Sequence, residues 1–250
     1  MIASPSSKPT PIVVLVHGAW HGAWCWAALQ AELDSRGIAS VAVDLPGHGV
    51  STEPLGDLVG DAAHLDAVIA TIDAPIVLVG HSYGGAVITE ASATSAVAAK
   101  VVHLVYLTAY VPDVGESVMG MARSMPPATT ALSEAMVMAD DHETFTIDPA
   151  SAHATFYGRC DPITTPANIA RLCPQPVATF AQPLTGAGWS SIPSTYVRCT
   201  LDEAIHISHQ DLMSAHCTNV ETLETDHSPF ASMPIQTAEI IARLTRDISL

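Results

Sequence analysis

Basic residues are scarce in this chain. Nine lysines and arginines stand against 25 aspartates and glutamates, which gives a formal net charge of −16. A phosphate backbone is repelled by such a chain, and no local cluster of lysine and arginine offsets the repulsion. We therefore expect no nucleic-acid partner, and we attribute the acidic balance to solubility rather than to recognition of a cationic substrate.

Cysteine is also scarce. The five cysteines are odd in number, widely scattered and without a CxxC pair, a pattern that argues against a disulfide framework and against a zinc knuckle. We expect small core residues at these positions, which are Cys25, Cys160, Cys173, Cys199 and Cys217.

Long hydrophobic runs are missing. No apolar stretch reaches the roughly 18 residues needed to cross a bilayer. The stretch from Met1 to Pro11 has one lysine and no continuous apolar run, unlike a signal peptide. These absences predict a cytoplasmic protein with no membrane partner.

Apolar residues are plentiful, at 48% of the chain, and only 14% of the residues are charged. This composition is typical of a chain that buries a large core. Because a single core grows to roughly 250 residues before chains split, we predict one domain over residues 1–250.

Short apolar runs alternate with helix-favouring segments in the first part of the chain. The expected strands are Ile12–Val16, Ala39–Leu45, Ile76–Val79 and Val101–Leu107, and the expected helices are Ala27–Arg36, Asp57–Ile72 and Ala86–Ala99. Such alternation predicts an α/β fold, in which helices cover both faces of a mostly parallel sheet.

The alternation stops between about residues 111 and 190, where prolines, methionines and alanines crowd together without a clear strand. We predict a lid insertion there, which leaves a core of about residues 12–110 and 191–247. Two strands and an amphipathic helix complete the core after the lid, at Ser194–Cys199, Asn219–Leu223 and Ile235–Leu244.

The most specific motif is Gly80-His81-Ser82-Tyr83-Gly84-Gly85, a G-x-S-x-G between a predicted strand and a predicted helix. A sharp strand-to-helix turn holds such a serine in strained backbone geometry, and the glycines prevent side-chain collisions across the turn. At a helix N-terminus, the backbone N–H of Tyr83 can stabilise a developing oxyanion. Ser82 is the predicted nucleophile.

A serine hydroxyl needs a base that is itself oriented by a third group. In α/β folds that carry a G-x-S-x-G turn, the acid and then the histidine follow the serine along the chain, each after a strand. Asp202 and His227 fit that order and are the predicted acid and base. Two other acids compete with Asp202: Asp113, which follows the strand Val101–Leu107, and Asp226, which adjoins the histidine.

The loop His17-Gly18-Ala19-Trp20 follows the first strand, where a second oxyanion donor is expected. We assign that role to the Ala19 N–H and expect His17 to brace the loop. The segment Asp44–Gly49 has turn residues and is interpreted as a structural turn without a catalytic role.

No cofactor is expected. His206 and His209 lie three residues apart, but no carboxylate or cysteine pattern of metal-ligand spacing accompanies them, so we predict no metal site. The glycine-rich stretches match neither a P-loop nor a dinucleotide fingerprint.

Taken together, these motifs resemble the methyl esterase and hydroxynitrile lyase branch of the α/β-hydrolase superfamily. The motifs concerned are the first loop up to Trp24, the serine turn, Leu201-Asp202-Glu203 and Asp226-His227. The resemblance runs from about Ile12 to Leu244 and is weakest across the lid.

The resemblance also separates two chemistries. The lyases of this branch carry a threonine after the first loop's histidine and a lysine after the catalytic histidine, where this chain has Gly18 and Ser228. Without that lysine a leaving cyanide lacks a positive partner, which favours ester hydrolysis. Relatives that use an aspartate nucleophile are disfavoured by Ser82.

The sequence thus predicts a serine hydrolase that cleaves small, largely apolar carboxylic esters through an acyl-enzyme. The apolar preference is inferred from lid residues, namely Met119, Met121, Met125, Met136, Phe145, Phe156 and Trp189. Further substrate-binding candidates are Trp20, His81, Trp189 and Ser228. The alternatives are a hydroxynitrile lyase or lactonase on the same triad, or a non-catalytic ligand-binding protein of this fold. A small-molecule ester is the expected partner, and the oligomeric state, a homodimer included, is left open.

Overall fold

The computed structural model describes residues 10–249 and is built around a six-stranded sheet. Every neighbouring pair of strands is parallel, in the order β2-β1-β3-β4-β8-β9. The strands are β1 (Ile12–Val16), β2 (Ser40–Val43), β3 (Ile76–His81), β4 (Val101–Leu107), β8 (Ser194–Cys199) and β9 (Asn219–Leu223). The predicted α/β fold is confirmed. The expectation about Met1–Pro11 falls almost wholly outside the described residues.

Strand β1 is apolar throughout, and β3 and β4 are apolar except for one histidine each and a glycine in β3, because both faces of the sheet are covered. Successive side chains point to opposite faces, so Val14 and Val16 of β1 enter one core cluster, and Val13 and Leu15 enter the other. All four are completely buried.

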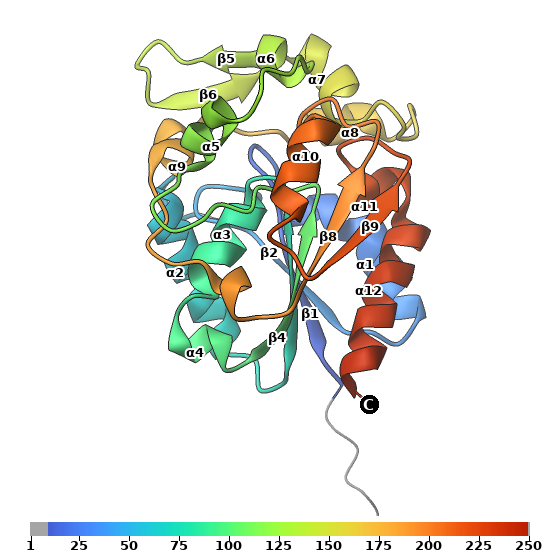
Figure 1. Cartoon of the computed structure of the whole chain (residues 1–250). Helices are drawn as coiled ribbons and strands as arrows, with labels where there is room; N and C mark the ends of the chain where they lie inside the picture. Colours follow the sequence, from blue (N-terminus) through green and yellow to red (C-terminus); the bar gives the residue numbers. More distant parts are fainter. Residues whose placement is uncertain (1–9, 250) are drawn as a thin grey trace, which may run out of the picture.

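Helices form a layer on each face of the sheet (Figure 1). The first layer comprises α2 (Leu58–Ala70), α3 (Gly84–Ala91), α4 (Ser95–Ala98) and α10 (Ile207–Ser214). The second layer comprises the 3-10 helix η1 (Ala23–Trp26), α1 (Ala27–Ser35), α11 (Pro229–Ser232) and α12 (Pro234–Ser249).

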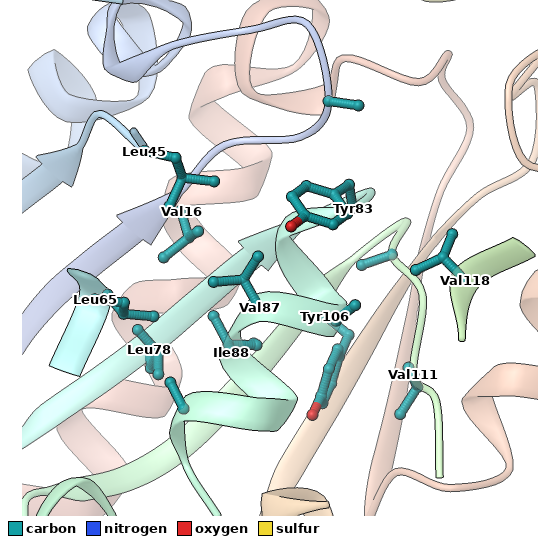
Figure 2. Packing of buried hydrophobic residues seen from close by; sticks show 14 of the residues in the cluster. Val16, Leu45, Leu65, Leu78, Tyr83, Val87, Ile88, Tyr106, Val111 and Val118 are labelled. Carbon is teal, nitrogen blue, oxygen red and sulfur yellow. The ribbon is translucent and has the colours of Figure 1, made fainter. Parts of the chain in front are cut away.

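The core cluster of the first layer packs α3 against the sheet. Figure 2 shows Val87 and Ile88 of α3 close to Leu78 of β3 and Tyr106 of β4. The buried hydroxyl of Tyr106 lies 2.9 Å from Thr89 Oγ1, so this polar atom is not left without a partner. The packing fixes the start of α3, where the serine motif lies.

One predicted helix is two. The sequence predicted a helix over Ala86–Ala99, but α3 ends at Ala91 and α4 begins at Ser95. Ser92 Oγ donates to Ile88 O at 2.5 Å and Thr94 Oγ1 donates to Ala91 O at 3.1 Å. These polar side chains compete for the helix carbonyls, which ends α3 early.

Most of the segment between β4 and β8 lies over one end of the sheet (Figure 1), whereas its last helical turn, Gly188–Ser190, packs against the C-terminal end of α3. Its helices are α5 (Val118–Ser124), α6 (Leu132–Ala135), α7 (Pro149–Phe156), α8 (Thr165–Ile169), α9 (Val177–Ala181) and the 3-10 helix η2 (Gly188–Ser190). We call this segment the lid and keep the predicted bounds of about 111–190 for it.

The sequence shows no clear strand in the lid, but the structure has three short ones. It contains a small antiparallel sheet of β5 (Met136–Met138), β6 (Thr144–Ile147) and β7 (Gln175–Pro176). These strands have only two to four residues, too few to produce a recognisable alternation in the sequence. They form because β5 and β6 are joined by a hairpin turn, in which the Ala139 N–H donates to Thr144 O at 2.9 Å.

The cysteines are free. Cys25 and Cys199 are buried, and the remaining three are partly buried. Over residues 10–249, none of the helices has both the length and the apolar content that crossing a bilayer requires.

Candidate active site

Ser82 occupies a strained turn between β3 and α3. Its φ is 51°, in the left-handed region that a residue with a side chain rarely adopts, at a typical cost of about 1–3 kcal/mol. The turn closes only with glycine on either side. A Cβ on Gly80 would lie 2.5 Å from Gly84 O, and a Cβ on Gly84 would lie 2.6 Å from Val16 O.

Asp202 and His227 meet beside this turn. The Nδ1–H of His227 donates to Asp202 Oδ2 at 2.7 Å, and both side chains are almost completely buried. This contact leaves His227 Nε2 unprotonated in the neutral ring and available as a base. The other carboxylate oxygen, Oδ1, accepts the N–H groups of Ala204 and Ile205 at 2.6 and 2.8 Å.

The two competing acids have other partners. Asp113 is exposed, and its side chain accepts the N–H of Val114. Asp226 is buried, but its carboxylate accepts the N–H groups of Arg159 and Ser228. Of the three candidates, Asp202 is the one whose carboxylate contacts the His227 ring.

His81 directly precedes Ser82 in the chain, and its ring contacts His227. Its ring centroid lies 4.5 Å from that of His227, and its Nε2–H donates to His227 O at 2.8 Å. Within residues 10–249 no hydrogen bond joins the Ser82 hydroxyl to the His227 ring. Hydrogen bonds between a nucleophile and its base are commonly loose without substrate and tighten in the complex.

Two backbone N–H groups beside Ser82 donate no hydrogen bond within residues 10–249. No hydrogen bond uses the N–H of Ala19 or of Tyr83 in the part of the chain that the structure describes. Both belong to segments packed on the serine: Tyr83 follows it in the chain, and a Cβ on Gly18 would lie 2.8 Å from Ser82 Cβ. Free donors at this place can stabilise an oxyanion.

The first loop is held by neutral histidines. His17 Nδ1 donates to Gly18 O at 2.8 Å and its Nε2 accepts the Leu45 N–H at 3.1 Å. His21 Nδ1 donates to Ala19 O at 2.8 Å. Burial lowers the pKa of His17 and His81, and it lowers the pKa of His21 from 6.5 to about 4. All three rings are therefore uncharged at neutral pH.

Tyr83 is anchored by a buried carboxyl group. Its ring is fully buried, and its hydroxyl donates to Asp61 Oδ2 on α2 at 2.7 Å. Burial is the main cause that raises the pKa of Asp61, to about 7. This anchor fixes the residue whose N–H adjoins the serine.

A cavity of about 150 Å³ opens over Ser82 beneath the lid. Apart from the Ser82 and Tyr110 hydroxyls, its lining side chains are almost entirely apolar. They are Ala19, Trp20, Ser82, Tyr110, Val118, Met119, Ala122, Leu132, Met136, Phe145, Phe180 and Ile205.

Residues 13–240 match the sequence profile described as the alpha/beta hydrolase family. This chain belongs to that family. The matched range covers all six strands of the central sheet except the first residue of β1.

Several characterised relatives resemble this alpha/beta hydrolase. A carbendazim hydrolyzing esterase of Nocardioides sp. (strain SG-4G) is 39% identical over 123 residues, which are 47% of this chain and half of that enzyme's length. Methylesterase 2 of Arabidopsis thaliana is 28% identical over 88% of this chain and 90% of its own.

Solved structures share the fold over nearly the whole chain. A pyrethroid hydrolase from Sphingobium faniae JZ-2 superposes with a TM-score of 0.83 at 24% identity, covering 94% of this chain and 97% of that one. The methylesterase MES16 from Arabidopsis has a TM-score of 0.77 at 26% identity, covering 94% and 99%.

The lid residues from which the apolar preference is inferred divide into two groups in this hydrolase, those that line the cavity and those that do not. Met119, Met136 and Phe145 line the cavity. The others belong to the core or pack against it, and they are Met121, Met125, Phe156 and Trp189.

Of the four further substrate-binding candidates, Trp20 lines the cavity. His81 and Ser228 are completely buried and are not part of the lining. Trp189 stacks on His216 with ring centroids 4.4 Å apart and donates its indole N–H to Pro112 O.

Sequence reasoning missed the residues that support Asp202. Thr108, which follows β4 with a left-handed φ of 39°, donates its hydroxyl to Asp202 Oδ2. Gln210 of α10 donates its amide N–H to the same oxygen at 3.3 Å and to Ile205 O at 2.7 Å. Neither residue belongs to a motif; only the position of Thr108 after a strand end could have suggested it.

His206 and His209 do not form a metal site. His206 caps the N-terminus of α10 through Ser208, and His209 Nε2 contacts Pro126 O at 2.7 Å. Over the described residues, no group of three or more histidine, cysteine, aspartate or glutamate side chains is placed to hold a metal ion.

Proposed function

We propose that this chain is a carboxylic ester hydrolase that works through an acyl-enzyme on Ser82, with His227 as the base and Asp202 orienting His227. One observation carries the proposal: the strained backbone of Ser82 at the base of an apolar cavity. Strained backbone of this kind is concentrated at active sites, where the surrounding structure holds it in place.

In the first half of the reaction, Ser82 Oγ attacks the ester carbonyl carbon while His227 Nε2 takes its proton. The tetrahedral intermediate collapses, the bond to the alcohol oxygen breaks, and that oxygen takes the proton back from His227. An acyl-serine remains. The Asp202 carboxylate stabilises the imidazolium that forms in this half-reaction, and its hydrogen bond to Nδ1 keeps the ring in the required tautomer.

In the second half, a water molecule gives its proton to His227 Nε2 and attacks the acyl carbon. The second tetrahedral intermediate expels Ser82 Oγ, which regains the proton, and the carboxylic acid leaves. Both intermediates carry a negative oxygen, which the free N–H groups of Ala19 and Tyr83 are available to bind. One such donor typically contributes about 2.7–4 kcal/mol of transition-state stabilisation.

The cavity supports a substrate with one small apolar arm. A dry apolar cavity of about 150 Å³ holds a ligand the size of benzene, and the cavity over Ser82 has about that volume. We therefore expect esters in which the acyl or the alcohol group is no larger than about a phenyl ring or a butyl chain. The names of the relatives, a carbendazim esterase, methylesterases and pyrethroid hydrolases, support ester hydrolysis as the reaction class.

Ser228 bears on the lyase alternative. It follows His227 where the lyases of this branch have lysine, and it presents a buried hydroxyl with no hydrogen-bond partner in the described residues. A neutral hydroxyl cannot neutralise a leaving cyanide, so cyanohydrin cleavage is disfavoured.

The test is turnover of p-nitrophenyl acetate and butyrate by the wild type and by Ser82→Ala, with a fluorophosphonate probe to count reactive serines. We expect turnover and one labelled serine in the wild type and neither in the variant. Equal turnover in both proteins refutes the proposal. Cleavage of mandelonitrile without ester hydrolysis points to the lyase, and a wild type without label or turnover points to a binding protein.

A further inference from the structure

Trp20 has an unusual backbone. It follows the proposed oxyanion donor Ala19 and has a φ of 63°, which is an outlier for a bulky aromatic residue. The conformation typically costs about 1–3 kcal/mol and must be held by surrounding contacts.

Those contacts come from the lid. The Trp20 N–H donates to Gln175 Oε1 at 3.1 Å, its carbonyl accepts the Cys173 N–H at 3.0 Å, and its indole N–H donates to Phe145 O at 3.1 Å. The lid residues lie 125 to 155 positions further along the chain. All three polar groups of Trp20 are thus bound to the lid.

Gln175 is built into this arrangement as a buried amide. It is completely buried, and its Nε2 donates to Thr179 Oγ1 at 2.8 Å, which holds the amide plane. Its Oε1 also contacts His48 Nε2 at 2.9 Å. Burial of an amide costs free energy unless each of its polar atoms is paired, as they are here.

The peptide between Ala19 and Trp20 is consequently held at both ends. The carbonyl of this peptide accepts from His21 Nδ1, and the N–H of the peptide donates to Gln175. The His21 ring is itself fixed, because its Nε2 accepts the Tyr157 hydroxyl at 2.8 Å. Rotation of this peptide is coupled to rotation of the preceding one through the backbone of Ala19. The preceding peptide carries the free Ala19 N–H.

We propose that Gln175 is a positioning residue of the oxyanion hole, because it holds Trp20 in the left-handed conformation that directs the Ala19 N–H at the substrate oxygen. This inference rests on the proposed esterase function. It makes the lid part of the catalytic apparatus as well as a wall of the cavity.

Gln175→Met tests the inference, since methionine is similar in size and unbranched but has no strong acceptor. Loss of a whole oxyanion donor lowers kcat about 10²- to 10³-fold, so a misdirected donor is expected to lower kcat by about 10- to 100-fold. KM for p-nitrophenyl butyrate should stay within about twofold, because Gln175 itself does not line the cavity. Active sites are counted with the fluorophosphonate probe, so that kcat refers to folded enzyme.

A second readout separates positioning from general loss of structure. Butylboronic acid forms a tetrahedral adduct with a reactive serine, and its affinity should fall by the same factor as kcat. Thr195→Val is the matched control: Thr195 is buried and contacts His103 Nε2 at 2.9 Å within the sheet. This variant should lose stability but keep the wild-type kcat.

Thr179→Val provides a second route to the same answer if Gln175→Met does not fold. It leaves Gln175 in place but removes the acceptor that orients its amide, and we expect a several-fold lower kcat with unchanged KM. Wild-type kcat and boronate affinity in folded Gln175→Met, or in Thr179→Val if the first variant does not fold, overturn the inference. An inactive wild type instead overturns the proposed function.

Discussion

Replacing Asp202 by asparagine changes one atom and should reverse the tautomer of His227. Asp202 Oδ1 accepts two backbone N–H groups, from Ala204 and Ile205, whereas the donors to Oδ2 are side chains, those of His227, Thr108 and Gln210. An asparagine has one acceptor oxygen and one NH2 group. Since backbone N–H groups cannot be turned around, the asparagine oxygen must stay toward them and its NH2 must face the histidine.

This exchange changes which nitrogen of His227, the proposed base, carries the proton. Facing a donor, His227 Nδ1 becomes the acceptor, and the ring proton moves to Nε2, which can no longer take a proton from Ser82. An equivalent exchange in a serine protease lowers kcat about 10⁴-fold, which corresponds to about 5.5 kcal/mol of transition-state stabilisation. We expect a loss of this order in Asp202→Asn, with little change in KM.

The assay is steady-state hydrolysis of p-nitrophenyl butyrate, normalised to the amount of folded protein. Asp226→Asn is the matched control, because Asp226 is an adjacent buried acid that binds backbone N–H groups and not the His227 ring. It should lose stability, by about 1–3 kcal/mol for a buried donor left unpaired, and keep its kcat. The reasoning is refuted if Asp202→Asn stays within tenfold of the wild type or if Asp226→Asn is the inactive variant.

Two further outcomes are expected. The first concerns acid stability. The pKa of His21 is about 4 in the folded chain and 6.5 in the unfolded chain, so between these pH values the unfolded chain binds a proton that the folded chain does not. The free energy of unfolding therefore falls as the pH drops from 6.5 toward 4. Down to pH 5 His21 contributes about 2 kcal/mol to that fall. Urea unfolding of His21→Gln between pH 7.5 and 5 should therefore show a shallower decline of the free energy of unfolding than the wild type, and an equally steep decline contradicts the assignment. The second concerns the length of the acyl chain of the substrate. Met136→Ala enlarges the cavity that Met136 lines, so kcat/KM for the p-nitrophenyl hexanoate ester should rise by about tenfold relative to the butyrate ester. This factor follows from about 0.8 kcal/mol for each of the two additional buried CH2 groups. Met138→Ala, at an exposed position of the same strand, should leave this ratio unchanged, and an unchanged ratio in Met136→Ala argues against the cavity as the site of that arm.

The sequence alone determined the order of the core elements and the place of the nucleophile. Strands β1, β4, β8 and β9 begin and end where the apolar runs predict. For β1 and β4 this success has a local cause, because a strand buried on both faces is a nearly continuous apolar run. β8 and the edge strand β9 contain polar residues, and β9 is largely exposed. The turn at Ser82 is local only in part, since Gly80 is required by Gly84 O four residues away, whereas Gly84 is required by Val16 O of the neighbouring strand β1.

The tertiary structure decided everything that depends on which distant residues meet. Three acids compete on sequence grounds, and only the folded chain brings Asp202 to within 2.7 Å of His227 across 25 positions. The lid hairpin is local, but its strands are too short to give a recognisable alternation. The hydrogen bond between Gln175 and Trp20 has no local signal, because the two residues are 155 positions apart. Long-range packing selects such pairs, whereas composition and periodicity report only on a residue's near neighbours.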